Sequence, residues 1–424
     1  MVWASGTLAT FAVGVVLARW LGPAGYGVYG SAIAIVTLLA VPAQLGLPLL
    51  ATREVSATRG RGSPAEVATI GWWFTAIVTL ASAVLAAALW LLGELLQFGS
   101  AIGTAIPAVA ALLPALALSG LAAGLLRGQE RVVTSQFLDV LLRPLALLAA
   151  LLAWSHPLGS TQALGAQFVA TMFIAVLGLT LFFRGLPMMA AGGMKRIRGW
   201  TAAALPMTLL EAMRALEGGY AVLIAGHAAS IADAGLLRVA IASSVLVSLP
   251  ISLQSIVTGP FLARAHADGE AERLARIVAA STVFMSATVA AALLVLALVG
   301  QWAIPFAFGE GFAPAYTLLL ILGANQLLSA LTGPTVMLLS MTGSEGMVAR
   351  AYIISVLSAV AAALLLTPVF GVVGAAASML VATVSRGIML NRHARQVLDI
   401  EPSLWGAIKV FAGLHATTSQ NWRR

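Results

Sequence analysis

Apolar residues in this chain form long runs separated by short polar segments, and the runs have the length that crosses a membrane. A transmembrane helix needs about 20 mostly apolar residues. On this basis we predict twelve helices, at residues 2–18, 28–51, 68–92, 104–126, 138–154, 162–183, 201–226, 234–258, 277–299, 315–340, 348–366 and 371–391. A short apolar segment beginning at Leu404 is followed by polar residues. We expect the tail, residues 396–424, to lie on the cytoplasmic interface of the membrane.

Composition supports this pattern and excludes several kinds of function. The chain is 60% hydrophobic and 9% charged, whereas an ordinary soluble domain is about 25% charged. There is no cysteine, and no two of the five histidines lie three or four residues apart. Disulfides, thiolate metal sites and helix-borne histidine pairs are therefore excluded. We predict an all-α polytopic membrane protein that is not an enzyme and has no cofactor or metal.

The basic residues indicate the orientation in the membrane. They gather in alternate loops, as the positive-inside rule describes; these residues are Arg53, Arg59, Arg61, Arg127, Arg131, Arg184, Lys195, Arg196, Arg198, Arg264, Arg273, Arg276, Arg350, Arg392 and Arg395. We predict that both termini are cytoplasmic and that the protein lies in the plasma (inner) membrane of a bacterium or archaeon. The net charge of +8 then reflects membrane topology, and we expect no nucleic-acid partner.

A weak internal repeat divides the chain into halves. Residues 27–45 align without a gap to residues 235–253, pairing Gly27 with Gly235 and Pro42 with Pro250. With small gaps, Ser119-Gly120 pairs with Thr332-Gly333. Six spans return the chain to its starting side, so the halves are parallel repeats, which in transporters move against each other around a central site. We predict two six-helix lobes, residues 1–190 and 191–395, followed by the tail.

Two stretches carry a family resemblance. Residues 17–56 contain Leu21-Gly22-Pro23 followed by Tyr26-Gly27, and residues 308–378 contain Gly371-x-x-Gly374-Ala375-Ala376. Both resemble the polysaccharide and oligosaccharide flippases (lipopolysaccharide O-antigen flippase-like) of the multidrug/oligosaccharidyl-lipid/polysaccharide exporter superfamily. The resemblance implies two six-helix lobes around a central cavity. It also implies that a polyprenyl-diphosphate-linked oligosaccharide moves from the inner to the outer leaflet, with coupling to an ion gradient (protons or sodium) or to the membrane potential.

Charged residues inside a predicted span mark candidate functional sites, because burying a charge in the bilayer is costly. The span 201–226 holds Glu211, Arg214 and Glu217, three residues apart on one broad face. They form either a ladder of ion pairs that neutralises itself or a cluster facing the cavity. In the second interpretation Arg214 binds the diphosphate, and Glu211 or Glu217 binds the coupling ion.

Other polar residues in or near the spans extend this hypothesis. Guanidinium groups stay charged and grip phosphate oxygens bidentately, so the remaining candidates for the diphosphate are Arg19, Arg53, Arg143, Arg238 and Arg386. The alternatives are pairing of Arg143 with Asp139, snorkelling of Arg386, and anchoring of the first hairpin by Arg19 and Arg53. Glycan contacts are predicted for Gln44, Asn325 and Gln326, which could instead serve helix–helix hydrogen bonding.

The sequence therefore predicts a flippase for a lipid-linked oligosaccharide used in cell-surface polysaccharide synthesis, working by alternating access. Its partners would be that cargo, membrane lipids, and a polysaccharide polymerase and glycosyltransferases. Two alternatives stay open. A cation-coupled multidrug exporter of the same superfamily would favour an acidic cavity, whereas here the intramembrane arginines at least match the acids in number. The chain could also be an inactive scaffold subunit of a polysaccharide assembly complex.

Overall fold

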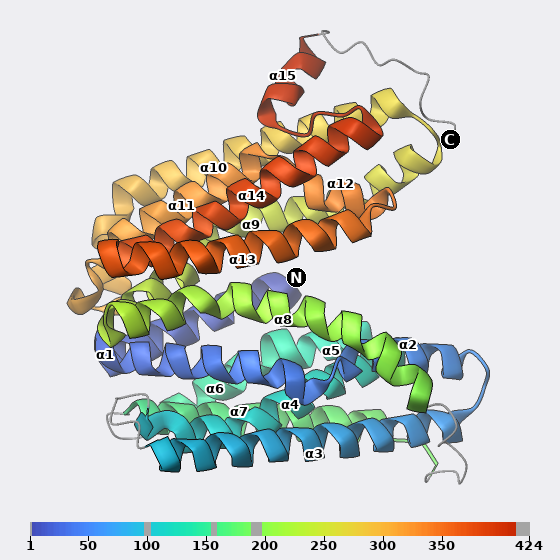
Figure 1. Ribbon diagram of the computed structural model, residues 1–424, viewed down its shortest axis with the longest axis vertical. Helices are drawn as coiled ribbons and strands as arrows, with labels where there is room; N and C mark the ends of the chain where they lie inside the picture. Colours follow the sequence, from blue (N-terminus) through green and yellow to red (C-terminus); the bar gives the residue numbers. More distant parts are fainter. Residues whose placement is uncertain (1, 97–102, 154–158, 188–196, 413–424) are drawn as a thin grey trace. The chain divides into compact units, whose positions relative to one another are not determined.

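A computed structural model describes residues 2–96, 103–153, 159–187 and 197–412, and within these ranges its regular elements are all helices, joined by short turns, without strands. Contacts divide the chain into two compact units (Figure 1). The first unit is Met1–Gly226 with Ile231–Gly235, and the second is His227–Ser230 with Leu236–Arg424.

The described part of the first unit contains eight α-helices, a 3₁₀ turn and a π-helix. Its elements are α1 (Val2–Gln44), α2 (Leu47–Arg59), α3 (Pro64–Leu96), the 3₁₀ turn η1 (Gly103–Ala105), α4 (Ile106–Gly128), α5 (Val132–Gln136), the π-helix η2 (Phe137–Leu142), α6 (Arg143–Leu152), α7 (Ser160–Phe183) and α8 (Ile197–Ala228).

The second unit begins in the turn after α8 and takes in nearly all of the next helix. Its elements are α9 (Ile231–Ala267), α10 (Ala271–Phe308), the 3₁₀ turn η4 (Glu310–Phe312), α11 (Ala315–Leu331), α12 (Thr335–Met341), α13 (Glu345–Phe370), α14 (Val372–Leu398) and α15 (Leu404–Phe411). The first five residues of α9 belong to the first unit.

The helices agree with the predicted membrane spans. Among the described residues, nine helices are long and apolar enough to cross a membrane, or ten if α11 and α12 form one broken span. This number counts α1 once, although Gly22, at φ 64° and ψ 177°, divides it into two helical segments. Each of the twelve predicted ranges overlaps a helix. The all-α polytopic membrane fold is confirmed, and α1 kinks within Leu21-Gly22-Pro23, between the first two predicted spans.

Helix α4 is the centre of the first unit, and it packs against α1, α2, α3 and α7. Gly120, Gly124 and Gly128 lie four residues apart on one of its faces. A Cβ atom at Gly124 would overlap the Pro48 carbonyl oxygen, and one at Gly128 would lie 2.7 Å from the Val55 Cβ. Small residues at this spacing let helix backbones approach closely in membranes. We name the three residues the α4 glycine stripe; Gly124 and Gly128 bring α2 onto α4, and Gly120 lies against the Gln44 side chain of α1.

The chain breaks between α1 and α2, inside the range predicted as one span. Leu45 and Gly46 both have positive φ, at 51° and 69°. Glycine adopts this conformation readily, whereas in leucine it strains the backbone. The Thr52 hydroxyl donates to the Gly124 carbonyl at 3.0 Å, which fixes the redirected helix α2 on the glycine stripe.

The start of α9 crosses α1 at a point where both helices carry glycine. A Cβ atom at Gly27 would overlap the Ile231 carbonyl oxygen and lie 3.1 Å from the Gly235 nitrogen. A Cβ atom at Gly235 would in turn overlap the Pro23 carbonyl oxygen and lie 3.0 Å from the Gly27 nitrogen. The repeat alignment that pairs Gly27 with Gly235 also pairs Pro23 with Ile231. The contact is therefore reciprocal between residues that the repeat alignment makes equivalent.

A second break, in the second unit, separates α11 from α12 by a bend of 41° at Thr332–Pro334. Here the chain segment at residues 399–411, which we name the C-terminal strap, lies against the break. The Pro402 carbonyl accepts a hydrogen bond from the buried Thr282 hydroxyl at 2.8 Å. A Cβ atom at Gly333, whose φ is 77°, would overlap the same carbonyl oxygen. The strap therefore fills the space beside this break.

Candidate functional site

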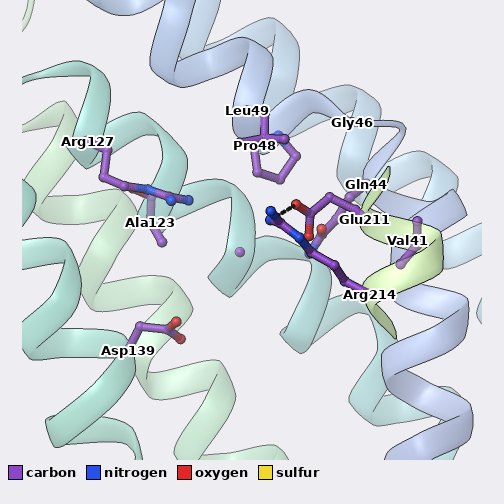
Figure 2. A pocket seen from close by; sticks show the side chains of 11 residues that line it. Val41, Gln44, Gly46, Pro48, Leu49, Ala123, Arg127, Asp139, Glu211 and Arg214 are labelled. Atoms are coloured by element: carbon purple, nitrogen blue, oxygen red, sulfur yellow. Dashed lines mark hydrogen bonds and ion pairs between the residues drawn. The ribbon is translucent and has the colours of Figure 1, made fainter. Parts of the chain in front are cut away.

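The first unit contains a cavity of about 280 Å³ beside the break between α1 and α2 (Figure 2). The lining residues come from α1, the break, α2, α4, η2 and α8; they are Val41, Gln44, Gly46, Pro48, Leu49, Gly120, Ala123, Arg127, Asp139, Glu211 and Arg214. Pockets for drug-sized ligands occupy roughly 300–1,000 Å³. The cavity therefore matches a ligand headgroup better than a whole lipid-linked sugar.

The local backbone explains why the cavity lies here. The break at Gly46 ends α1 and offsets α2, so the two helices do not continue one another across this site. The Gln44 side chain donates weak hydrogen bonds to the Leu116 and Ala117 carbonyls of α4, at 3.5 and 3.4 Å. Gln44 thus ties the end of α1 to α4, which is the structural role that the sequence left open for it. It also lines the cavity, so its predicted glycan contact stays a prediction.

Glu211 and Arg214 form an ion pair at the cavity wall. An Arg214 guanidinium nitrogen lies 3.0 Å from a Glu211 carboxylate oxygen, and the dashed line in Figure 2 marks this contact. The two side chains are 57% and 38% exposed, for Arg214 and Glu211 respectively. Pairs three residues apart on a solvated helix contribute only about 0.2–0.5 kcal/mol. The pair neutralises itself and also faces the cavity, so both interpretations of this cluster describe part of it.

Asp139 reaches the cavity from the π-helix η2. A π-helix inserts one extra residue per turn and is common at functional sites. The turn precedes Pro144, which lacks a backbone donor. Asp139 pairs with Arg143 at 3.1 Å, as the sequence spacing predicts. Arg143 itself does not line the cavity.

Arg127 is the cavity residue that sequence reasoning missed. It lies in the last turn of α4, and in Figure 2 its guanidinium extends toward the Glu211–Arg214 pair. Its Nε donates to the Ala123 carbonyl at 3.2 Å. Among the described residues it forms no ion pair with a carboxylate, unlike Arg143 and Arg214. In the sequence, Arg127 stands between Gly124 and Gly128, which is the signal that it belongs to the helix. The positive-inside pattern instead assigned it to a loop.

Three other candidates of the first unit lie outside the cavity lining. Arg53 is exposed on α2 and pairs with its neighbour Glu54 at 3.0 Å. Arg19 is exposed on the first segment of α1, and Glu217 is half-buried on α8. Of the predicted site residues, the structure brings Gln44, Glu211 and Arg214 into one cavity.

The remaining candidates belong to the second unit. Arg238 is half-buried on α9, and Gln326 is half-buried on α11. The Arg386 guanidinium lies 5.3 Å from the centre of the Tyr352 ring, a cation–π distance. The Asn325 Oδ1 atom is buried and has no hydrogen-bond partner among the described residues. Their predicted roles stay predictions.

Comparison with known proteins identifies the family. The family model described as "Polysaccharide biosynthesis protein" matches residues 2–266, more than half of the chain. The chain belongs to the polysaccharide biosynthesis protein family. No curated protein matches the sequence.

Solved structures show the fold that this polysaccharide biosynthesis protein shares. An inward-facing multidrug resistance MATE family transporter of the MOP superfamily matches with a TM-score of 0.74 and 13% identity, covering 97% of this chain and 96% of the other. Lipid II flippase MurJ in an inward closed conformation matches with a TM-score of 0.74 and 12% identity, covering 99% and 92%. A MOP superfamily transporter from Pyrococcus furiosus, described as having a binding pocket of reverse polarity, matches at 0.58 and 13%, covering 98% and 94%. The resemblance seen in the sequence is confirmed.

Proposed function

We propose that this protein is a flippase that moves a polyprenyl-diphosphate-linked oligosaccharide from the inner to the outer leaflet. The observation that carries the proposal is the cavity in which Arg127 and Arg214 face a space of headgroup size. Membership of the polysaccharide biosynthesis family supports the biological context. The fold shared with a lipid II flippase supports the class of transport.

The charges at the cavity suit a diphosphate. Asp139 is paired with Arg143, and Glu211 with Arg214. Of the described charged side chains that line the cavity, Arg127 is therefore the one that a ligand can bind without first breaking an ion pair. Hydrogen bonds between charged groups contribute about 1.5–3 kcal/mol each, more than the helix pair holding Arg214. An arriving phosphate therefore binds Arg127 first and then displaces Glu211 from Arg214.

This exchange offers a route to ion coupling. Once phosphate holds Arg214, the Glu211 carboxylate has lost its cation and can take a proton or sodium ion. Release of the cargo at the outer leaflet restores the ion pair and expels that ion on the same side. Because binding of the anionic cargo and of the coupling cation stabilises the same state, the two cross together, so an outward-directed cation gradient speeds this exchange and an inward-directed one slows it.

The location of the cavity fits loading from the cytoplasmic side. Arg127 lies at the end of α4 that leads into a basic loop, and the positive-inside rule assigns such loops to the cytoplasm. In this orientation both termini are cytoplasmic and the cavity opens in the inner half of the plasma membrane. The sugars extend past Gln44, while the polyprenyl tail remains in lipid. The glycan contacts predicted for Asn325 and Gln326, which belong to the second unit, stay a separate prediction. A polymerase and glycosyltransferases would use and supply the cargo.

The test is leaflet exchange of a fluorescent polyprenyl-diphosphate oligosaccharide in proteoliposomes, with and without a proton or sodium gradient. We expect exchange above that of empty liposomes. Arg127→Gln and Arg214→Gln should each slow it about tenfold, the equivalent of one lost charged contact. Arg276→Gln is the matched control, since that arginine is exposed on α10 and pairs with Glu272. Glu211→Gln should retain cargo binding and lose the response to the gradient.

Other outcomes would assign a different function. Efflux of a cationic dye without lipid exchange, lost in Asp139→Asn and Glu211→Gln, would identify a cation-coupled exporter that uses the carboxylates of the same cavity. Folded protein with neither activity would identify a scaffold subunit. Equal exchange by the parent, Arg127→Gln and Arg276→Gln would remove Arg127 from the site.

A further inference from the structure

Helix α15 carries an apolar face that no described part of the chain covers. Trp405, Ile408 and Phe411 are 64%, 50% and 62% exposed and follow one another at three-residue intervals, so they share one face. On the opposite face, Gly406 and Ala407 are buried, and α15 packs against α10. The helix therefore has a fixed inner face and a free outer face.

A polar cluster centred on Glu401 sets the direction of that outer face. The Glu401 carboxylate, whose side chain is 11% exposed, accepts from Arg395 of α14 and from Lys409 of α15, the latter at 3.1 Å. It also accepts from the Ser403 hydroxyl at 3.2 Å, while the Ser403 oxygen caps the start of α15. These contacts tie α15 to the end of α14, so the helix cannot roll to hide its apolar residues.

The chemistry of the face indicates what covers it. Eight residues of helix rise about 12 Å, too little to cross a hydrocarbon core of about 30 Å. Short helices with large apolar residues on one side and basic residues beside them lie in the membrane interface. The Lys409 ammonium lies 5.6 Å from the Trp405 ring centre, so a cation flanks the apolar face. Arg395, in the last turn of α14, pairs with the same Glu401 carboxylate as Lys409. Both helices that hold the strap, α10 and α14, are candidate spans.

We propose that α15 is an in-plane anchor that inserts Trp405, Ile408 and Phe411 into the boundary between headgroups and acyl chains of the inner leaflet. Lys409 and Arg395 lie at the level of the anionic headgroups. The anchor holds the C-terminal strap, and with it the Pro402 carbonyl, against Gly333 at the break between α11 and α12. The proposal concerns lipid contact of the second unit and does not depend on the cargo of the first.

Because the chain contains no cysteine, single spin labels report on chosen positions. Labels would be placed at Ile408→Cys on the proposed anchor, at Asp268→Cys in the exposed α9–α10 turn, and at Leu294→Cys on the exposed apolar side of α10. Collision with oxygen and with a water-soluble nickel chelate is measured in liposomes of phosphatidylcholine and phosphatidylglycerol. We expect the chelate to reach the Ile408 label at least threefold less than the Asp268 label, with oxygen access between those of Asp268 and Leu294. Equal chelate access at Ile408 and Asp268 would overturn the proposal, and so would dipolar broadening that grows with protein density, which would indicate a second copy on the face.

A charge variant tests the role of the Glu401 cluster. Glu401→Gln should increase the mobile fraction of the Ile408 label at least twofold, since both cationic tethers lose their carboxylate. Glu272→Gln is the matched control, because it breaks an exposed glutamate–arginine pair whose two members both belong to α10. If Glu401→Gln fails to elute as the parent does, Lys409→Gln removes one tether and gives the same comparison. An unchanged spectrum in a folded variant would show that Glu401 does not orient the anchor.

Discussion

The two units each break a predicted span, but at different places and with different results. In the first unit the break at Leu45–Gly46 separates α1 from α2, and a cavity lies beside it. In the second, the break at Thr332–Pro334 is filled by the C-terminal strap. The repeat pairs Gly46 with Gln254, which lies in the uninterrupted helix α9, and Gly333 with Gly120, which lies inside α4. The two breaks are therefore at non-equivalent positions of the repeat, and one borders a cavity whereas the other is filled by the C-terminal strap.

The largest expected effect comes from closing the space that α2 needs on α4. Gly124→Leu places a side chain where the Pro48 carbonyl lies. Overpacking of this kind destabilises by about 1–3 kcal/mol or more, and we expect the upper end, since the obstacle is backbone. Thermal unfolding in detergent measures it. Gly165→Leu on α7 is the control, because no atom lies within 4 Å of its ideal Cβ; equal losses in the two variants would contradict the stripe's role.

The second-largest effect is expected at the break between α11 and α12, which the C-terminal strap fills. Gly333→Ala adds left-handed strain of about 1–2 kcal/mol and an overlap with the Pro402 carbonyl. Gly343→Ala has a similar positive φ, 81° against 77°, and open space around its Cβ. We expect Gly333→Ala to lower the unfolding temperature clearly more than Gly343→Ala. An equal change in the unfolding temperature of the two variants would show that the C-terminal strap does not pack against Gly333.

A smaller effect is expected from one hydrogen bond. Thr282→Val removes the buried donor to the Pro402 carbonyl and should destabilise by about 1 kcal/mol. Thr288→Val is matched to it, because that hydroxyl bonds only carbonyls of its own helix, at Phe284 and Met285. Chemical unfolding followed by circular dichroism compares them. If Thr282→Val lowered the free energy of unfolding less than Thr288→Val, the hydrogen bond to Pro402 would not stabilise the C-terminal strap.

The smallest effect has the opposite sign. Leu45→Gly removes left-handed strain of about 1–2 kcal/mol and adds about 0.5–1 kcal/mol of backbone entropy to the unfolded chain. Because Leu45 is exposed, it loses little packing. We expect a net gain of about 0.5–1 kcal/mol in the free energy of unfolding. A loss instead would show that the leucine side chain, and not the geometry of the break, supports the cavity.

The sequence was sufficient for the features that depend on local pattern. Each of the twelve ranges predicted from hydropathy overlaps a helix, Leu21-Gly22-Pro23 lies at the kink in α1, and three-residue spacing placed Glu211 beside Arg214. The cavity could not be predicted in the same way, because Arg127, Gln44 and Asp139 converge through helix packing across the first unit. In the sequence, a basic residue after an apolar run looks the same whether the structure places it in a loop or at the wall of a cavity. The break at Gly46 was hidden because leucine and proline around it extend the apolar run.

The crossing of Gly27 and Gly235 has a consequence for the origin of the chain. Each glycine meets the backbone of the other copy at the equivalent residue, so the contact is self-complementary. A gene that encoded a single copy would therefore have made a product able to pair with itself through this surface. Fusion of two such genes would keep the contact while freeing each copy to diverge. A substitution at either glycine would disturb the backbone of both copies at once, whereas no such reciprocal contact joins Gly46 and Gln254 among the described glycine contacts.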